Sequence, residues 1–245
     1  MMNEEFIIPN WPAPDNIKAI QTTRNGGISL ENFSSLNLSK SVGDIDKHVE
    51  GNSMRLLNFL PSNPFWLNQI HSDKSEELPS ESNLNCDASY TYNLKIVCAV
   101  RTADCLPIFL TNFEGSFVAI IHAGWKGLLS GVIEKTIDKI SSSSEIIVWL
   151  GPCIGQESFE VGNDIHDSFL QKDSNTKKAF KLLKNRYYLD LAGAARLKLN
   201  HLNIDNISGA GITDNFCTFK DKKQFFSYRR DGNTGRMASL LWIDS

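Results

Sequence analysis

At 245 residues, the chain is long enough to bury a substantial core in one large or two small domains. Its hydrophobic content of 41%, charged content of 22% and net charge of −3 are ordinary, and they give no electrostatic case for nucleic acid or an anionic membrane as partner. No apolar run approaches the roughly 18 residues of a membrane span, and the acidic start is unlike a secretory signal, so we expect a cytoplasmic protein.

Short β-branched or aromatic runs bounded by turn residues predict the strands. In chain order they cover 17–23, 64–70, 96–100, 106–111, 117–122, 145–150, 224–228 and 238–243. Helical periodicity predicts helices over 47–60, 127–140, 162–171, 176–184 and 190–202. The polar stretches 71–86 and 172–178 are predicted loops.

Several predicted strands follow one another without a helix between them, which disfavours a purely doubly wound fold. No internal repeat or Pro/Gly-rich linker divides the chain. The prediction is therefore an α+β fold, with a single domain over residues 1–245 in which mixed β-sheets form a sandwich-like arrangement flanked by helices.

The cysteines are scattered and odd in number, which predicts reduced thiols rather than a disulfide framework. The five are Cys86, Cys98, Cys105, Cys153 and Cys217, without a CxxC pair. We expect most of them to be small buried hydrophobes.

Three segments place a metal-binding or nucleophilic side chain at a strand boundary. "WLNQIHSD" ends an apolar run on His71, "TADCLPIFL" begins one directly after Cys105, and "AIIHAGW" ends one on His122. Two imidazoles and a thiolate are a ligand set of catalytic zinc sites, where the fourth position stays open for water or substrate. The same atoms could form a Cys–His nucleophilic pair, and each residue taken alone could be structural.

Other polar residues are weaker candidates. Arg24, Arg229 and Arg230 stand beside turn residues, where guanidinium groups suit a phosphate or carboxylate partner. Asp104, beside the cysteine, is a candidate outer partner or acid–base group. The remaining histidines are expected to be exposed in helices, and two aromatic pairs are expected in the core: His48, His166 and His201, and Tyr187–Tyr188 and Phe225–Phe226.

Motifs along nearly the whole chain carry a resemblance to a known family. They include "TTRNGGIS", "WLNQIHS", "TADCLPI", "HAGWKGL", "WLGPCIG", "LDLAGAAR" and "FFSYRRDGNTGRMASLLW". In these residues and their order the chain resembles the YfiH-type purine nucleoside phosphorylases, also called laccase-domain or polyphenol oxidase proteins, and most of all the bacterial members.

The resemblance implies a zinc ion held by His71, Cys105 and His122. It also implies phosphorolysis of adenosine, inosine and S-methyl-5′-thioadenosine to a free purine and a ribose 1-phosphate, with adenosine deamination as a second activity. Purine nucleosides and phosphate are thus the expected partners. From residue type, Arg24 and Arg229 are the candidates to hold the phosphate.

Three other functions stay open. A Cys–His hydrolase acting on an amide, for instance in editing cell-wall (peptidoglycan) precursors, is also allowed by the resemblance. Copper-dependent phenol oxidation is disfavoured because a multicopper oxidase needs many more histidines than five. A structural zinc in a binding module is disfavoured because such zinc normally has four protein ligands.

Overall fold

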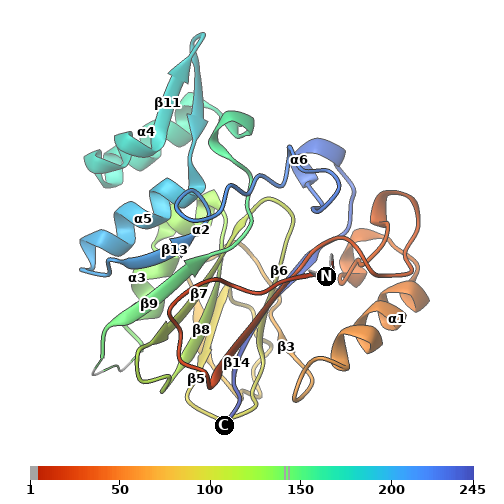
Figure 1. Ribbon diagram of the computed structural model, residues 1–245. Coiled ribbons are helices and arrows are strands. Elements are labelled where there is room, and N and C mark those ends of the chain that lie inside the picture. Colours follow the sequence, from red (N-terminus) through yellow and green to blue (C-terminus); the bar gives the residue numbers. More distant parts are fainter. Residues whose placement is uncertain (1–4, 141, 143) are drawn as a thin grey trace.

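Two β-sheets face each other at the centre of the computed structural model, which describes residues 5–140, 142 and 144–245 (Figure 1). The first has five strands, in the order β1 (Phe6–Ile7), β2 (Ile17–Thr22), β14 (Met237–Ile243), β6 (Cys98–Thr102) and β3 (Phe65–Trp66). The second has six, in the order β13 (Asn206–Gly209), β9 (Ile146–Leu150), β7 (Leu106–Asn112), β8 (Val118–Ala123), β5 (Ala88–Thr91) and β4 (Ser75–Glu77).

Both sheets mix parallel and antiparallel neighbours. β3 runs parallel to β6, β4 to β5 and β13 to β9, whereas the other neighbours in these two sheets are antiparallel. The α+β prediction, with mixed sheets in a sandwich-like arrangement, is therefore confirmed.

Alternation of side chains along the central strands builds the core between the sheets. Val118 and Ile120 of β8 pack with Phe109 of β7 against Val100 of β6. Ile121 points the opposite way, into the cluster that helices cover. His122, the next residue along β8, therefore points back into the space between the sheets.

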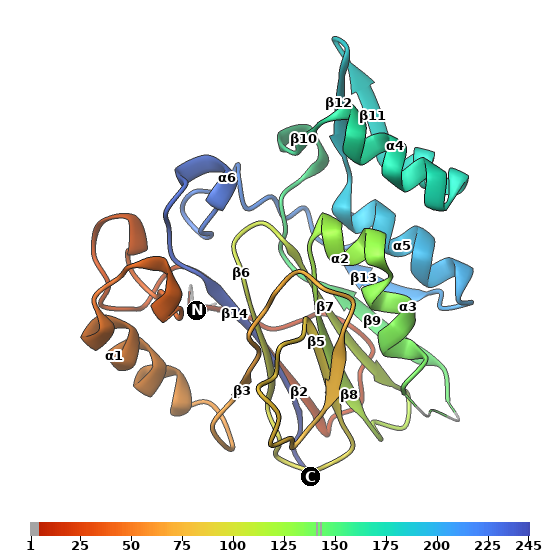
Figure 2. The ribbon, with the colours of Figure 1, turned by 180° about the vertical axis from the view of Figure 1, so that it is seen from behind.

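Helices cover the outer faces of both sheets (Figures 1 and 2). The six-stranded sheet is covered by α2 (Trp125–Ser130), α3 (Val132–Ile137) and α5 (Leu191–His201). The five-stranded sheet is covered by α1 (Asp46–Leu57) and the segment before it, through Leu36, Leu38 and Leu56. The flanking helices are thus where the α+β prediction places them.

A smaller, antiparallel sheet projects from the helical side of the molecule (Figure 2). Its order is β10 (Glu160–Val161), β12 (Arg186–Leu189) and β11 (Phe180–Leu183), and it packs with α4 (Asn163–Lys172). The short α6 (Tyr228–Asp231) lies on the chain between β13 and β14.

Two predicted strands differ from the structure. The run 64–70 forms strand only at Phe65–Trp66. The run 224–228 is wrong as a strand: Phe225 and Phe226 are buried, but without a strand partner, and α6 follows directly. Their apolar character comes from burial beside Met237 rather than from a sheet ladder.

Two predicted helices also differ. The helix over 127–140 is interrupted at Gly131, whose φ of 97° ends α2 and begins α3. The helix over 176–184 is wrong, because a 3₁₀ helix (Ser174–Ala179) leads into β11. The hairpin that follows turns at Lys184 and Asn185, both with positive φ, as a two-residue hairpin turn requires.

Besides β11, the strands that were not predicted are short or polar: β1, β4, β5, β10, β12 and β13. β4 lies inside the predicted loop 71–86. In the described part of the chain, no helix is long and apolar enough to cross a membrane.

Candidate metal centre

His71, Cys105 and His122 come together at one end of the space between the sheets. Their donor atoms lie within 4.8 Å of one another, with Cys105 Sγ 3.9 Å from His71 Nε2. The two imidazole rings stand edge-on, with centroids 4.9 Å apart. Over the ranges that the structure describes, this is the one group of three or more His, Cys, Asp or Glu side chains able to hold a metal.

These separations suit a tetrahedral ion. With Zn–S near 2.3 Å and Zn–N near 2.0–2.1 Å, tetrahedral ligands lie about 3.5 Å apart. The 3.9 Å between Cys105 Sγ and His71 Nε2 needs only a small contraction to reach that value. Three protein donors would leave the fourth position open.

Strand register explains why two of the donors meet. β7 and β8 are antiparallel with Pro107 opposite His122, and Cys105 stands two residues before Pro107. Residues two apart share a face of the sheet, so the thiol lies on the same side as the imidazole. Both lie on the face that looks toward the five-stranded sheet, as Ile120 does.

Asp87, just before β5, organises the two histidine donors and was not among the predicted site residues. Its buried carboxylate accepts hydrogen bonds from His122 Nδ1 at 2.8 Å and from the backbone N–H of His71 at 3.0 Å. It also accepts from Ser72, through the backbone N–H at 2.6 Å and the hydroxyl at 2.8 Å. The bond at Nδ1 leaves His122 Nε2 free for a metal.

The same carboxylate holds His71 in an unusual backbone conformation. His71 has a φ of 59°, in the left-handed region that few residues other than glycine adopt. The bonds from the N–H groups of Ile70, His71 and Ser72 to Asp87 fix this turn. One buried carboxylate thus orients both imidazoles.

Electrostatics in the metal-free protein favour a charged pair. Burial alone would raise the pKa of the Cys105 thiol, but His122 and His71 lower it to about 6. Burial would lower the pKa of His122, but Cys105 and Asp87 raise it to about 9. Burial likewise opposes ionisation of Asp87, yet the hydrogen bonds from His122 and Ser72 hold its pKa below the ordinary value. Metal binding needs a neutral imidazole and would therefore release a proton from His122.

Gly124 leaves room for the donors directly after β8. A Cβ at this position would lie 3.0 Å from Cys105 Sγ and 3.2 Å from His71 Cδ2. Its φ of −75° is open to any residue, so space rather than backbone freedom explains the glycine here.

We expect Gly124→Ala to weaken zinc binding by about tenfold, because two ligands must shift to make room for the methyl group. Chelator competition on the purified protein measures this. Gly127→Ala is the matched control, since its Cβ would meet Ser72 O and Val132 at 3.3–3.4 Å and no donor atom. Equal zinc affinity in the two variants would contradict the steric explanation.

A cavity of about 840 Å³ opens beside the donor group, within the usual range for small-molecule sites. All three donor residues line it, together with Trp66 and Tyr228. Its charged side chains are those of Lys40, Arg101 and Arg236, all basic. Among the residues that the structure describes, no Asp or Glu lines it. Such a cavity suits an uncharged ligand together with an anion.

The other predicted site residues lie outside the cavity lining. Asp104 Oδ1 accepts a hydrogen bond from Thr218 Oγ1 at 2.6 Å, and Oδ2 accepts one from the backbone N–H of Arg229 at 2.7 Å. The second bond ties the start of α6 to the cysteine loop, the segment of Asp104 and Cys105 that precedes β7. The Arg229 guanidinium donates to Glu160 O at 2.9 Å and lies over Phe159. The roles predicted for Asp104 and Arg229 stay predictions.

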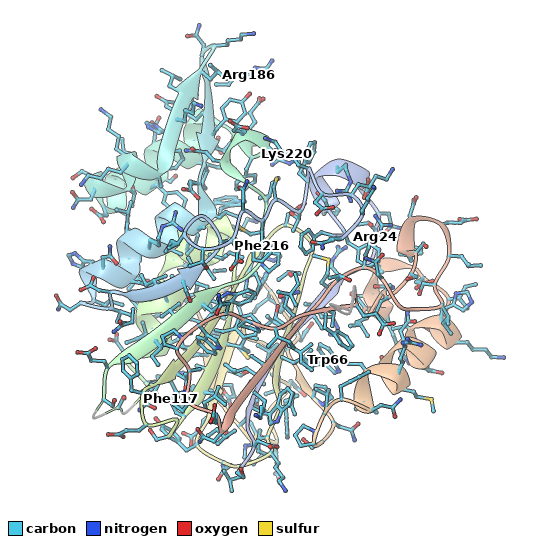
Figure 3. All side chains as sticks on the ribbon, viewed as in Figure 1. Arg24, Trp66, Phe117, Arg186, Phe216 and Lys220 are labelled. Atoms are coloured by element: carbon cyan, nitrogen blue, oxygen red, sulfur yellow. The ribbon has the colours of Figure 1, made fainter. Side chains whose placement is uncertain are left out.

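Arg24 and Arg230 bind backbone carbonyls. Arg24 donates to Ser34 O and Lys222 O and lies over Phe226, near α6 in Figure 3. Arg230 donates to the carbonyls of residues 218, 219 and 225 and pairs with Asp231 at 2.7 Å. Both guanidinium groups therefore hold loops together, and the phosphate role predicted for Arg24 stays a prediction.

The expectation that the remaining histidines are exposed is wrong for His166. Its side chain is 7% exposed, its ring stacks on Tyr187 at 3.7 Å, and Nδ1 lies 2.8 Å from Asp167. The small sheet covers this face of α4, which the helix sequence alone does not reveal. His201 is exposed and His48 is half-buried.

Comparison with known proteins gives consistent matches over the full chain. The family model described as multi-copper polyphenol oxidoreductase laccase matches residues 18–244. The purine nucleoside phosphorylase YfiH of Escherichia coli (strain K12) is 41% identical over 244 residues, covering 98% of this chain and 99% of that protein. A purine nucleoside phosphorylase of Haemophilus influenzae is 44% identical over 247 residues, covering 98% and 100%.

Solved structures agree. Neisseria meningitidis protein NMB0706 superposes with a TM-score of 0.87 at 39% identity, covering 98% of this chain and all of that one. The Bacillus licheniformis hypothetical protein YfiH gives a TM-score of 0.84 at 28% identity, covering 99% and 98%.

Proposed function

Because the chain belongs to the family described as multi-copper polyphenol oxidoreductase laccase, and because two relatives at 41% and 44% identity are named purine nucleoside phosphorylases, we propose that it cleaves purine nucleosides with phosphate. The observation that carries this proposal is the group of His71, Cys105 and His122, which opens onto a cavity whose described lining residues include no acid. The proposed substrates are adenosine, inosine and S-methyl-5′-thioadenosine, with adenosine deamination as a second activity.

Zinc is the proposed metal. Two imidazoles and one thiolate suit it, and three donors leave a position for substrate or water. Multicopper chemistry requires several copper sites, whereas the described residues hold one donor group with two of the chain's five histidines. A bound zinc ion would act as a Lewis acid at the reacting centre.

The chain's own residues have separable roles in this proposal. Asp87 accepts a hydrogen bond from Nδ1–H of His122 and so keeps Nε2 directed at the donor group. Cys105, as thiolate, supplies negative charge. Asp104, with both oxygens already bonded, would act by holding the cysteine loop against α6, or as the acid–base group that its position beside Cys105 suggests.

The test is an assay of zinc-loaded protein with adenosine, inosine and S-methyl-5′-thioadenosine, each with and without phosphate. We expect free purine and ribose 1-phosphate (or its methylthio counterpart) only when phosphate is present, and inosine from adenosine in either condition. Base release that is independent of phosphate, or no release from any of the three, would overturn the phosphorylase proposal.

One observation favours a second candidate, a Cys–His hydrolase acting on amides such as peptidoglycan precursors. The lowered pKa of Cys105 and the bond between His122 and Asp87 resemble an activated thiol, its base and the group that orients the base. This candidate requires amide hydrolysis that alkylation of Cys105 abolishes and that chelators leave intact. Loss of turnover with chelator, restored by zinc, would exclude it.

A further inference from the structure

Two half-buried arginines of the cavity wall start from adjacent strands. Arg101 belongs to β6, and Arg236 stands directly before β14. The strands are antiparallel with Arg101 opposite Ala238, so Arg236 takes the diagonal position on the same face. Diagonal neighbours in a sheet lie about 7–8 Å apart. The two guanidinium groups therefore extend into the cavity from neighbouring points.

Both arginines have side-chain N–H groups that form no hydrogen bond with the described part of the chain. Arg101 uses Nε on Leu38 O at 2.6 Å and lies over the Trp66 ring at 3.9 Å. Arg236 uses Nη1 on the carbonyls of Thr234 and Gly235. A guanidinium carries five N–H groups, so each residue retains several that no atom of the described chain accepts.

No carboxylate forms an ion pair with either arginine among the residues that the structure describes. Burial lowers the pKa of Arg101 to about 10. Burial also lowers the pKa of Arg236, with Cys105 and Asp104 opposing the shift from nearby. The third basic residue of the cavity, Lys40, already pairs with Glu50 at 2.6 Å. Two partly desolvated positive charges thus face a cavity in which no described lining residue is an acid.

The segment after Leu38 adds hydroxyl groups to the same place. Leu38 N–H donates to Arg236 O, while Leu38 O accepts from Arg101 Nε, so both arginines hold this segment. Ser39 and Ser41 follow, with hydroxyl oxygens 2.9 Å apart, and both line the cavity. Tetrahedral oxyanions such as phosphate accept paired hydrogen bonds from guanidinium groups, and neighbouring hydroxyl groups can donate further ones.

We infer that Arg101 and Arg236, with Ser39 and Ser41, form the subsite for inorganic phosphate. This inference rests on the proposed function, because phosphate is the second substrate of phosphorolysis. Arg236 and Cys105 line the same cavity, so the anion would lie beside the metal group.

The chemistry balances with hydrogen phosphate. One phosphate oxygen forms a bond to C1′ of the ribose as the bond from C1′ to the purine nitrogen breaks. The electron pair of the broken bond leaves with the purine, and the proton of hydrogen phosphate passes to it. The products are the neutral purine and ribose 1-phosphate, and no further reactant is needed.

Steady-state kinetics of zinc-loaded variants test the subsite. Arg236→Gln and Arg101→Gln should raise the phosphate KM by roughly 10- to 100-fold, with the nucleoside KM and zinc content near wild type. Arg236→Lys should recover part of the loss. Arg186→Gln is the matched control, because Arg186 lies on the projecting hairpin far from Trp66 (Figure 3).

A phosphate KM that stays at the wild-type value in Arg236→Gln, while Arg24→Gln or Arg229→Gln raises it, would place the anion at the arginines predicted from turn position and overturn the inference. Arg236→Gln alone decides this if Arg101→Gln fails to fold through loss of its bond to Leu38.

A binding measurement separates this inference from the proposed function. Zinc-loaded protein without nucleoside is titrated calorimetrically with inorganic phosphate. If the wild type cleaves no nucleoside but binds phosphate, and Arg236→Gln does not bind it, the subsite stands and the phosphorylase proposal fails. Equal binding by both proteins, or none by the wild type, overturns the subsite whatever the turnover.

Discussion

His122→Ala should weaken zinc binding by more than about 100-fold and should lose nucleoside turnover to at least the same degree. His122 is 3% exposed and is the donor that connects the metal group to Asp87. Removing an outer partner of a metal ligand typically costs about 10- to 100-fold in affinity or activity, so removing the ligand itself should cost more. It also leaves Asp87 without one of its buried donors.

Zinc content by elemental analysis and phosphate-dependent purine release check this on the same sample. His166→Ala is a matched control: that imidazole is also buried and its Nδ1 lies 2.8 Å from a carboxylate, but the ring packs on Tyr187. We expect the control to lose stability and keep stoichiometric zinc. Retention of zinc and turnover by His122→Ala would refute the metal centre.

Residue type and strand boundaries made His71, Cys105 and His122 candidates for a metal or nucleophilic site, and only the family resemblance implied that they bind zinc. "IFL" after Cys105 and "VAII" before His122 are continuous apolar runs, and the structure makes both of them central strands of one sheet. Adjacent central strands leave few relative positions for residues at their ends. The position of His71 was harder to predict, because it follows a strand of only two residues and its turn is held by Asp87.

Asp87 could not be predicted because its role depends on register. It precedes β5, a four-residue strand of "ASYT" that pattern alone does not separate from a loop. Only the pairing of Ala88 with Ile121 brings the carboxylate beside His122. A buried acid in "NCDASYTY" is visible in the sequence, but its partner is not.

The sequence around an arginine likewise gives little indication of its neighbours in space. Arg24 stands beside turn residues, where a ligand-binding guanidinium is expected, yet it bonds loop carbonyls. Arg101 stands inside a strand and looks structural, but the diagonal across β6 and β14 places it with Arg236 at the cavity. Local sequence describes the backbone around an arginine and does not show which strand lies next to it.

Asp87→Asn should weaken zinc binding by roughly 10- to 100-fold and lower turnover with it. The carboxylate uses both oxygens as acceptors: Oδ1 for His71 N–H and His122 Nδ1, and Oδ2 for the N–H and hydroxyl of Ser72. An amide has one oxygen and one NH₂ group. If NH₂ faces Ser72, it opposes a backbone donor, and if it faces His122, it forces the proton onto Nε2, where the metal must bind.

Chelator competition gives the zinc affinity of Asp87→Asn, and ¹⁵N chemical shifts of the imidazole report the protonation state of His122 in the metal-free protein. Asp190→Asn, which keeps an oxygen for the N–H of Gly193 at the start of α5, controls for the substitution itself. Asp104→Asn, measured beside Asp87→Asn, compares the two carboxylates that could orient the metal ligands. The variant that loses zinc identifies the carboxylate that does so. Wild-type zinc affinity and an unchanged His122 protonation state in Asp87→Asn would show that strand packing alone positions the imidazole.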